Sequence, residues 1–226
     1  MIKSVIRDII NYADKYLCLR ALMRDENAKV HSLAGDRAIE WSWVTVRLPA
    51  EPCRVLDLGC VGSVLTGIAS RQGHYVTAVD LNEIEYEMPN VVFQQGDIIE
   101  MNWGDAQFDI IMNCSMIEHV GLGGRYGSRD RNDGDIIAMK RLHDLLATCG
   151  RMILTIPVGI DAEFRPFHRV YGEKRLPLLL SCYNLIQEEY WHKAKNSKWG
   201  ICDKQTALNT VGSAEFYSLG LFLLGK

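Results

Sequence analysis

The chain has 226 residues, of which 48% are hydrophobic and 23% are charged, and its formal net charge is −3. This length and composition are typical of one globular domain with a full core. An acidic chain lacks the lysine and arginine clusters that nucleic-acid binding needs, and its apolar runs are too short for a membrane span. Seven cysteines without C-x-x-C spacing indicate reduced thiols, so we expect a cytoplasmic protein.

The first fifty residues predict a helical cap. In residues 2–17, apolar side chains recur with helical spacing and leave one polar face of mixed charge. Because a membrane-surface helix is usually more basic, we expect this helix to pack on the domain. A second helix is expected over 35–48, where two following prolines end it. Residues 1–50 thus form an N-terminal cap within a single domain, 1–226.

A glycine turn between a buried strand and a helix is the most informative feature of the chain. The apolar run 55–58 predicts the strand, and Gly59 and Gly62 then let the backbone turn sharply and approach a ligand. After the helix, a second strand over 75–79 leads directly to Asp80. Strand, turn, helix, strand and terminal acid predict the nucleotide-binding half of a doubly wound α/β fold, with the carboxylate at the ribose hydroxyls.

The details of this turn leave the function open. The spacing is G-x-x-G rather than G-x-G-x-x-G, so the fingerprint of a nicotinamide cofactor is incomplete. Asp57 lies inside the strand just before the turn, where a carboxylate must be paired or hydrogen-bonded, and it suits a loop for a cationic ligand. A nicotinamide-dependent oxidoreductase and a non-catalytic cofactor-binding partner subunit both stay open at this point.

The remaining elements follow an alternating order. Strands are expected at 91–93, 108–112 and 151–156. Between the last two, a glycine-rich loop over 121–134 leads into a helix that is expected to stop near residues 149–150. This alternation predicts a sheet that is mostly parallel, with ligands bound beyond the carboxyl ends of its strands.

The last third of the chain predicts a lid and a closing strand pair. An insertion over 158–180 interleaves aromatic, histidine and arginine side chains, and with the glycine-rich loop it is expected to close over a substrate. Strands are expected over 183–191 and 216–224, with a short helix at 206–208 between them. The chain therefore predicts a doubly wound sheet of seven strands, with the cofactor-binding core over 53–160.

Three segments carry a resemblance to a known family. D-L-G-C at 57–60 with V-D at 79–80 resembles the class I S-adenosylmethionine-dependent methyltransferases. The segments F-D-I-I-M-N-C-S-M-I-E-H-V at 108–120 and G-R-M-I-L-T-I-P at 150–157 resemble the middle of bacterial small-molecule and sugar methyltransferases. The resemblance covers about 53–160. It implies a Rossmann-like fold whose last strand inserts antiparallel, and S-adenosyl-L-methionine as the cofactor.

The resemblance also implies a set of cofactor-binding residues. The glycines of the turn line the methionine moiety, and the acid after the second strand accepts from the ribose hydroxyls. The acid after the third strand accepts from the adenine amine, and the next side chain packs on the ring. The full set is Asp57, Gly59, Gly62, Asp80, Leu81, Asp97, Ile98 and Asn113.

Candidate catalytic residues come from the fourth strand end and from the insertion. Ser115, Glu118 and His119 resemble the E-x-x-E-H of metal-dependent O-methyltransferases, with Ser115 in place of the first acid. His168 takes a place comparable to a further histidine of the small-RNA-terminus branch. Either a histidine acts as a free general base, or Glu118, His119 and His168 hold a divalent metal. The missing acid favours the version without a metal.

The acceptor is expected to be a small molecule. Arginines in the glycine-rich loop and the insertion either meet a phosphate or carboxylate of the acceptor or are solvated loop charges. The motif after the fourth strand is not the N/D-P-P-Y/F of amine methylation, so we expect O-methylation of a sugar, sugar nucleotide or related metabolite. The candidate substrate-binding residues are Arg125, Arg165, Arg169 and Tyr171. The oligomeric state stays open.

Overall fold

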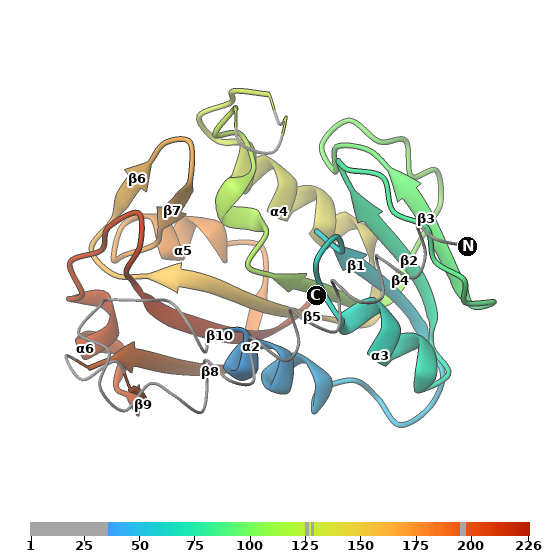
Figure 1. Ribbon diagram of the computed structural model, residues 1–226, viewed down its shortest axis with the longest axis horizontal. Coiled ribbons are helices and arrows are strands. Elements are labelled where there is room, and N and C mark those ends of the chain that lie inside the picture. The colour runs from blue at the N-terminus through green and yellow to red at the C-terminus, as the bar shows by residue number, and fades with distance from the viewer. Residues whose placement is uncertain (1–35, 125–126, 128, 195–197) are drawn as a thin grey trace, which may run out of the picture.

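The computed structural model describes residues 36–124, 127, 129–194 and 198–226. Its centre is an eight-stranded sheet in the order β3-β2-β1-β4-β5-β10-β8-β9 (Figure 1). The strands of this sheet are β1 (Arg54–Leu58), β2 (Tyr75–Asp80), β3 (Val91–Gln95), β4 (Phe108–Cys114), β5 (Leu146–Val158), β8 (Asn184–Lys193), β9 (Trp199–Cys202) and β10 (Ser218–Gly225). The helices are α2 (Asp36–Thr45), α3 (Leu65–Arg71), η1 (Ile117–His119), α4 (Gly134–Leu145), α5 (Arg175–Leu179) and α6 (Lys204–Leu208).

The sheet confirms the predicted fold class. Strands β1 to β5 pair in parallel, whereas β10 pairs antiparallel with both β5 and β8. Every residue of β10 is buried, as expected for a strand inside a sheet that is covered on both faces. The sheet has eight strands rather than the predicted seven, because β9 adds to the outer edge of β8.

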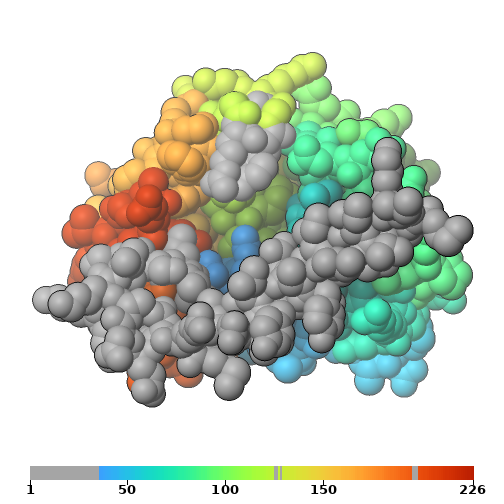
Figure 2. All heavy atoms as spheres, viewed as in Figure 1, coloured from blue at the N-terminus to red at the C-terminus, as the bar shows by residue number. Residues whose placement is uncertain are grey.

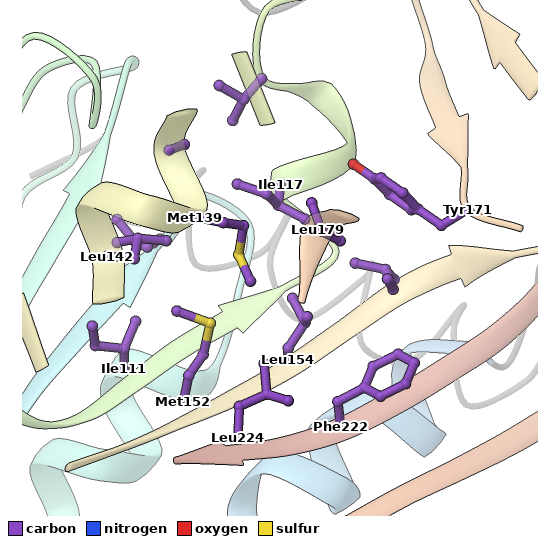
Figure 3. Close-up of a cluster of buried hydrophobic side chains, with 14 of the residues drawn as sticks. Ile111, Ile117, Met139, Leu142, Met152, Leu154, Tyr171, Leu179, Phe222 and Leu224 are labelled. Atoms are coloured by element: carbon purple, nitrogen blue, oxygen red, sulfur yellow. The ribbon is translucent and has the colours of Figure 1, made fainter. Parts of the chain in front are cut away.

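Helices cover the two faces of the sheet because successive residues of each strand point to opposite sides. On one face, Ile111 and Leu154 pack against Met139 and Leu142 of α4 (Figure 3). On the other, Ile110 packs in a second cluster with side chains of α2 and α3. Figure 2 shows the yellow-green residues before α4 at the top of the molecule, between the insertion and the β2–β3 side.

The predicted end of the helix before the fifth strand is wrong. α4 ends at Leu145, and Leu146 already pairs with Phe108 of β4. A side chain at Gly150 would meet the carbonyl oxygen of Phe108 at 2.9 Å, so this glycine permits close packing of two strands rather than capping a helix.

The insertion over 158–180 forms a small hairpin followed by α5. Its strands are β6 (Ala162–Phe164) and β7 (His168–Val170), which pair antiparallel. Of the predicted N-terminal cap, the structure describes α2, while the predicted helix over 2–17 lies outside the described residues. None of the helices within the described ranges is long and apolar enough to cross a membrane.

Candidate functional site

A pocket of about 250 Å³ opens beyond the carboxyl ends of β1, β2, β3 and β4. This is the edge of a doubly wound sheet at which ligands are expected to bind. The glycine turn, the residues after β2 and β3, and the turn after β4 form one part of its wall. Residues of α2 form another part, which the sequence did not predict.

The two glycines of the turn have different roles. Gly59 has a φ of +71°, and a side chain there would meet Cγ of Met116 at 2.7 Å. Gly62 has a φ of +82°, and no atom lies within 4 Å of the position its side chain would take. Gly59 therefore permits close packing beneath the turn, and Gly62 leaves open space on the pocket side.

Asp57 lies behind the pocket wall. Its side chain is buried, and Thr66 of α3 donates a hydrogen bond to its Oδ2 over 2.5 Å. Burial raises the pKa of this carboxyl to about 7. Asp57 is not one of the described residues that line the pocket, so it supports the turn from below by joining β1 to α3.

Asp80 holds the glycine turn at the end of β2. Its Oδ2 accepts from the backbone N–H of Val61 at 3.0 Å, and its Oδ1 accepts from that of Asn82 at 2.9 Å. Leu81 follows it in the pocket wall. The carboxylate thus faces the pocket from the predicted position, with both oxygens fixed by backbone donors.

Asp97 and Ile98 also line the pocket, whereas Asn113 does not. Asp97 Oδ1 accepts from the backbone N–H of Ile99 at 2.9 Å, and Ile98 is buried beside it. Asn113 is buried, and its Oδ1 accepts from the backbone N–H of Ile117 at 3.2 Å. Asn113 therefore fixes the start of η1 instead of facing the ligand space.

The two residues of the predicted Glu–His pair point to different surroundings. His119 lines the pocket, and its Nδ1 lies 2.5 Å from the carbonyl oxygen of Phe167. Glu118 is buried, and its Oε1 lies 3.7 Å from Nε2 of His119. Burial raises the pKa of Glu118 to about 8, so its carboxyl is mostly neutral at pH 7.

His168 is the third residue of the metal site considered from the sequence. It is buried on β7, where its ring packs edge-on against Tyr217 at 5.2 Å and lies 5.7 Å from Phe164. Within the part of the chain that the structure describes, no three histidine, cysteine or acidic side chains gather to hold a metal ion. The metal site considered from the sequence at Glu118, His119 and His168 therefore stays a prediction, with His168 packed against aromatic rings on β7.

Arg165 and Arg169 of the insertion connect neighbouring segments through ion pairs and hydrogen bonds. Arg169 is 1% exposed, and its Nη1 donates to the carbonyl oxygen of Val120 at 2.6 Å. Arg165 reaches Asp130 over 2.6 Å, and the buried Tyr171 donates to Asp135 over 3.0 Å. None of these three lines the pocket, because each side chain bonds to the segment that runs from the end of η1 into the first turn of α4. Arg125 lies outside the described residues.

Two residues of α2 that the sequence did not predict line the pocket. Arg37 and Trp41 lie one helical turn apart on the same side of α2. Arg37 is half-exposed and pairs with Oε2 of Glu40 over 2.8 Å. Oε1 of Glu40 accepts from Thr155 over 2.7 Å and also from Ser115. The sequence carried one signal for this part of the wall: Arg37 and Glu40 are charged residues in a helix with several apolar positions.

A family model described as "Caenorhabditis protein of unknown function, DUF268" matches residues 83–214, which is more than half of the chain. The chain belongs to this family. The matched range includes Asp97, the Glu–His pair and the insertion, while the glycine turn and α2 precede it.

Curated relatives match less than half of this chain. The ubiquinone biosynthesis O-methyltransferase of Xylella fastidiosa is 32% identical over 123 residues, which cover 47% of this chain and 48% of the relative. That of Maricaulis maris is 31% identical over 108 residues, which cover 43% of this chain and 38% of the relative. The match thus spans about half or less of these relatives.

Solved structures establish the fold. The 1,6-didemethyltoxoflavin-N1-methyltransferase of Burkholderia thailandensis, with bound S-adenosylhomocysteine, has a TM-score of 0.53 at 20% identity, covering 99% of this chain and 88% of that one. A TehB-like methyltransferase of Corynebacterium glutamicum has a TM-score of 0.55 at 19% identity, covering 96% of each chain. The [4+2]-cyclase SpnF has a TM-score of 0.60 at 14% identity, covering 89% of this chain and 84% of that one. The fold is that of the class I methyltransferases.

Proposed function

We propose that this chain is an S-adenosylmethionine-dependent methyltransferase that methylates a hydroxyl oxygen of a small polar acceptor, such as a sugar, a sugar nucleotide or a related metabolite. The observation that carries this proposal is one pocket in which the glycine turn, Asp80 and Asp97 meet. The curated O-methyltransferase relatives support the reaction type. Because a cyclase shares this fold, the fold alone does not define the reaction, and the proposal rests on the pocket.

The side chains of the pocket fit the chemistry of this cofactor. Asp80 and Asp97 each present carboxylate oxygens, which suit ribose hydroxyls and an exocyclic amine. Ile98 offers an apolar surface to a planar ring, and the open space at Gly62 admits a ligand close to the backbone. The half-exposed guanidinium of Arg37 suits a carboxylate such as that of the methionine moiety. When bound, the cofactor supplies a methyl group that is already activated on a sulfonium.

His119 is the candidate general base. Because a carbonyl oxygen only accepts, Nδ1 of His119 carries the proton in its contact with Phe167, and Nε2 carries the lone pair of the neutral ring. That nitrogen can take the proton of an acceptor hydroxyl. The neutral carboxyl of Glu118 adds little negative charge beside the ring at pH 7. His168 is less suited, since its ring packs against Tyr217 outside the pocket wall.

Parallel titrations distinguish the candidate cofactors. Calorimetry with S-adenosylhomocysteine and with NADH should show binding of the first alone, because the glycine spacing and the acids of the pocket suit an adenosine thioether ligand. Binding of NADH alone would favour the oxidoreductase and contradict the proposal.

A metabolite screen then tests the reaction. The protein is incubated with S-adenosylmethionine that carries a labelled methyl group and with fractionated polar metabolites. We expect label in a hydroxylated metabolite, and the same rate in the presence of EDTA if His119 acts as a free base. Cofactor binding without transfer in any fraction would favour a non-catalytic subunit. Loss of activity in EDTA with recovery in Mg²⁺ would favour the metal version.

A further inference from the structure

Glu40 of α2 connects three elements through one buried carboxylate. Its side chain is fully buried and lies outside the pocket wall. Oε2 pairs with Arg37 over 2.8 Å, and Oε1 accepts from Thr155 of β5 over 2.7 Å and from Ser115 after β4. A buried carboxylate is costly unless such partners compensate it, so this arrangement holds all three partners in place.

Two of these partners form part of the pocket wall. Arg37 contributes a guanidinium with five N–H donors, of which Glu40 engages one side. Glu40 thus sets the direction from which the rest of the guanidinium faces the pocket.

Ser115 begins the turn that leads to His119. Its φ is +48°, a left-handed conformation that a residue other than glycine keeps only when its surroundings hold it. Its backbone N–H donates to the carbonyl oxygen of Thr155 at 3.0 Å, and its hydroxyl donates to Glu40. The next residue, Met116, packs beneath Gly59 and accepts from the N–H of His119 at 3.0 Å. Glu40 therefore stabilises both the strained turn at Ser115 and the guanidinium of Arg37 in the pocket wall.

We propose that Glu40 is a positioning residue, which orients Arg37 toward the carboxylate of the cofactor's methionine moiety without touching the ligand itself. This inference rests on the proposed function. It predicts a selective effect, because only the affinity for ligands that carry this carboxylate should depend on Glu40.

The test compares two probes that differ in the amino-acid moiety. S-adenosylhomocysteine has the carboxylate, and 5′-methylthioadenosine keeps the adenine, ribose and thioether but lacks it. Glu40→Gln keeps an oxygen for Ser115 and Thr155 but removes the charge that pairs with Arg37. By calorimetry, the Kd of S-adenosylhomocysteine should rise about tenfold, and that of 5′-methylthioadenosine should change less than about twofold.

A matched ion pair at the opposite edge of the sheet serves as the control. Arg54 and Asp109 pair over 3.2 Å at the starts of β1 and β4, away from the pocket. Asp109→Asn should leave the Kd of both probes unchanged. In an Arg37→Ala background, adding Glu40→Gln should not weaken S-adenosylhomocysteine further, because the group that Glu40 orients is already gone.

Thermal unfolding of each variant checks that it is folded. If Glu40→Gln does not fold, Thr155→Val is measured in its place. This variant keeps the Arg37–Glu40 ion pair and removes one of the two hydroxyl groups that donate to Oε1 of Glu40. That variant should weaken S-adenosylhomocysteine about threefold and leave 5′-methylthioadenosine unchanged.

Equal losses for both probes, or no loss for either in the folded variant, would overturn the role of Glu40 while leaving the proposed function in place. A parent protein that binds neither probe would overturn the proposed function and this inference with it.

Discussion

The β1–β3 end of the pocket and the end formed by α2 and η1, with the β6–β7 hairpin packed against η1, hold their side chains by different means. At the first end, Asp80 bonds to Asn82 and Asp97 bonds to Ile99, each two residues along the chain, and Asp80 also bonds to Val61, 19 residues away. At the second end, Glu40 bonds to Thr155, 115 residues away, and His119 contacts Phe167, 48 residues away. We infer that changes at the first end weaken a ligand with the fold intact, whereas changes at the second end couple stability to function.

The largest expected effect separates the two histidines of the second end. His119→Ala should lower kcat by about 10²- to 10⁴-fold, because it removes the candidate base from the pocket wall. His168→Ala should instead cost about 2 kcal/mol of stability, because it removes a buried ring from contact with Tyr217. Turnover with the acceptor found in the screen and urea unfolding measure the two quantities. If both variants turn over at the parent rate, the Glu–His pair is a structural anchor.

The next effect concerns the two arginines of the insertion, Arg169 and Arg165. Arg169→Ala should lower the free energy of unfolding by about 3–5 kcal/mol, because it removes a buried cation from beside the buried carboxylate of Asp135 and the carbonyl oxygen of Val120. Arg165→Ala is the matched control, since that side chain is 37% exposed and its ion pairs are expected to contribute less than about 1 kcal/mol. Urea denaturation measures both. An Arg169→Ala variant of parent stability with a raised acceptor KM would instead support the acceptor role predicted from the sequence.

At the first end, Asp80→Ala should weaken S-adenosylhomocysteine by on the order of 1.5–3 kcal/mol, because two charge-assisted hydrogen bonds to the ribose are lost. Calorimetry measures this Kd. Asp203→Ala is the control, because Asp203 caps α6 by accepting from Thr206 and lies in another part of the chain. An unchanged affinity in Asp80→Ala would contradict the ribose assignment and with it the contrast between the two ends.

The smallest effect is a pH dependence of stability. Burial raises the pKa of Glu118 from 4.5 to about 8, so the folded state keeps a proton that the unfolded state releases. The stability that this proton contributes is full below about pH 4 and is lost as pH rises toward 8. Glu118→Gln cannot ionise, so its free energy of unfolding should rise relative to that of the parent as pH increases through that window.

Urea unfolding of parent and variant at several pH values measures this gain. For Asp57→Asn at the other end, the corresponding gain should level off near pH 7, the pKa to which burial raises Asp57. A constant difference between Glu118→Gln and the parent from pH 5 to 8 would show that Glu118 is ionised when folded.

The sequence alone predicted the doubly wound sheet and the acids at its carboxyl edge. Buried parallel strands are continuous apolar runs, and an acid or a glycine that follows such a run is placed by the strand itself. Asp80, Asp97 and Gly62 therefore lie at the pocket where their positions along the strands predict. Gly150 was misread, because a glycine after a helix and a glycine against a neighbouring strand look alike in sequence.

Only the tertiary structure decided the second end of the pocket. The direction of a side chain in the insertion depends on which loop packs against it, and this turned Arg169 and Tyr171 inward. The same dependence separated His119 from His168 and brought Arg37 and Glu40 to the ends of β4 and β5. A strand and its turn are local and carry their own signal, whereas a contact across 115 residues exists only once the chain has folded.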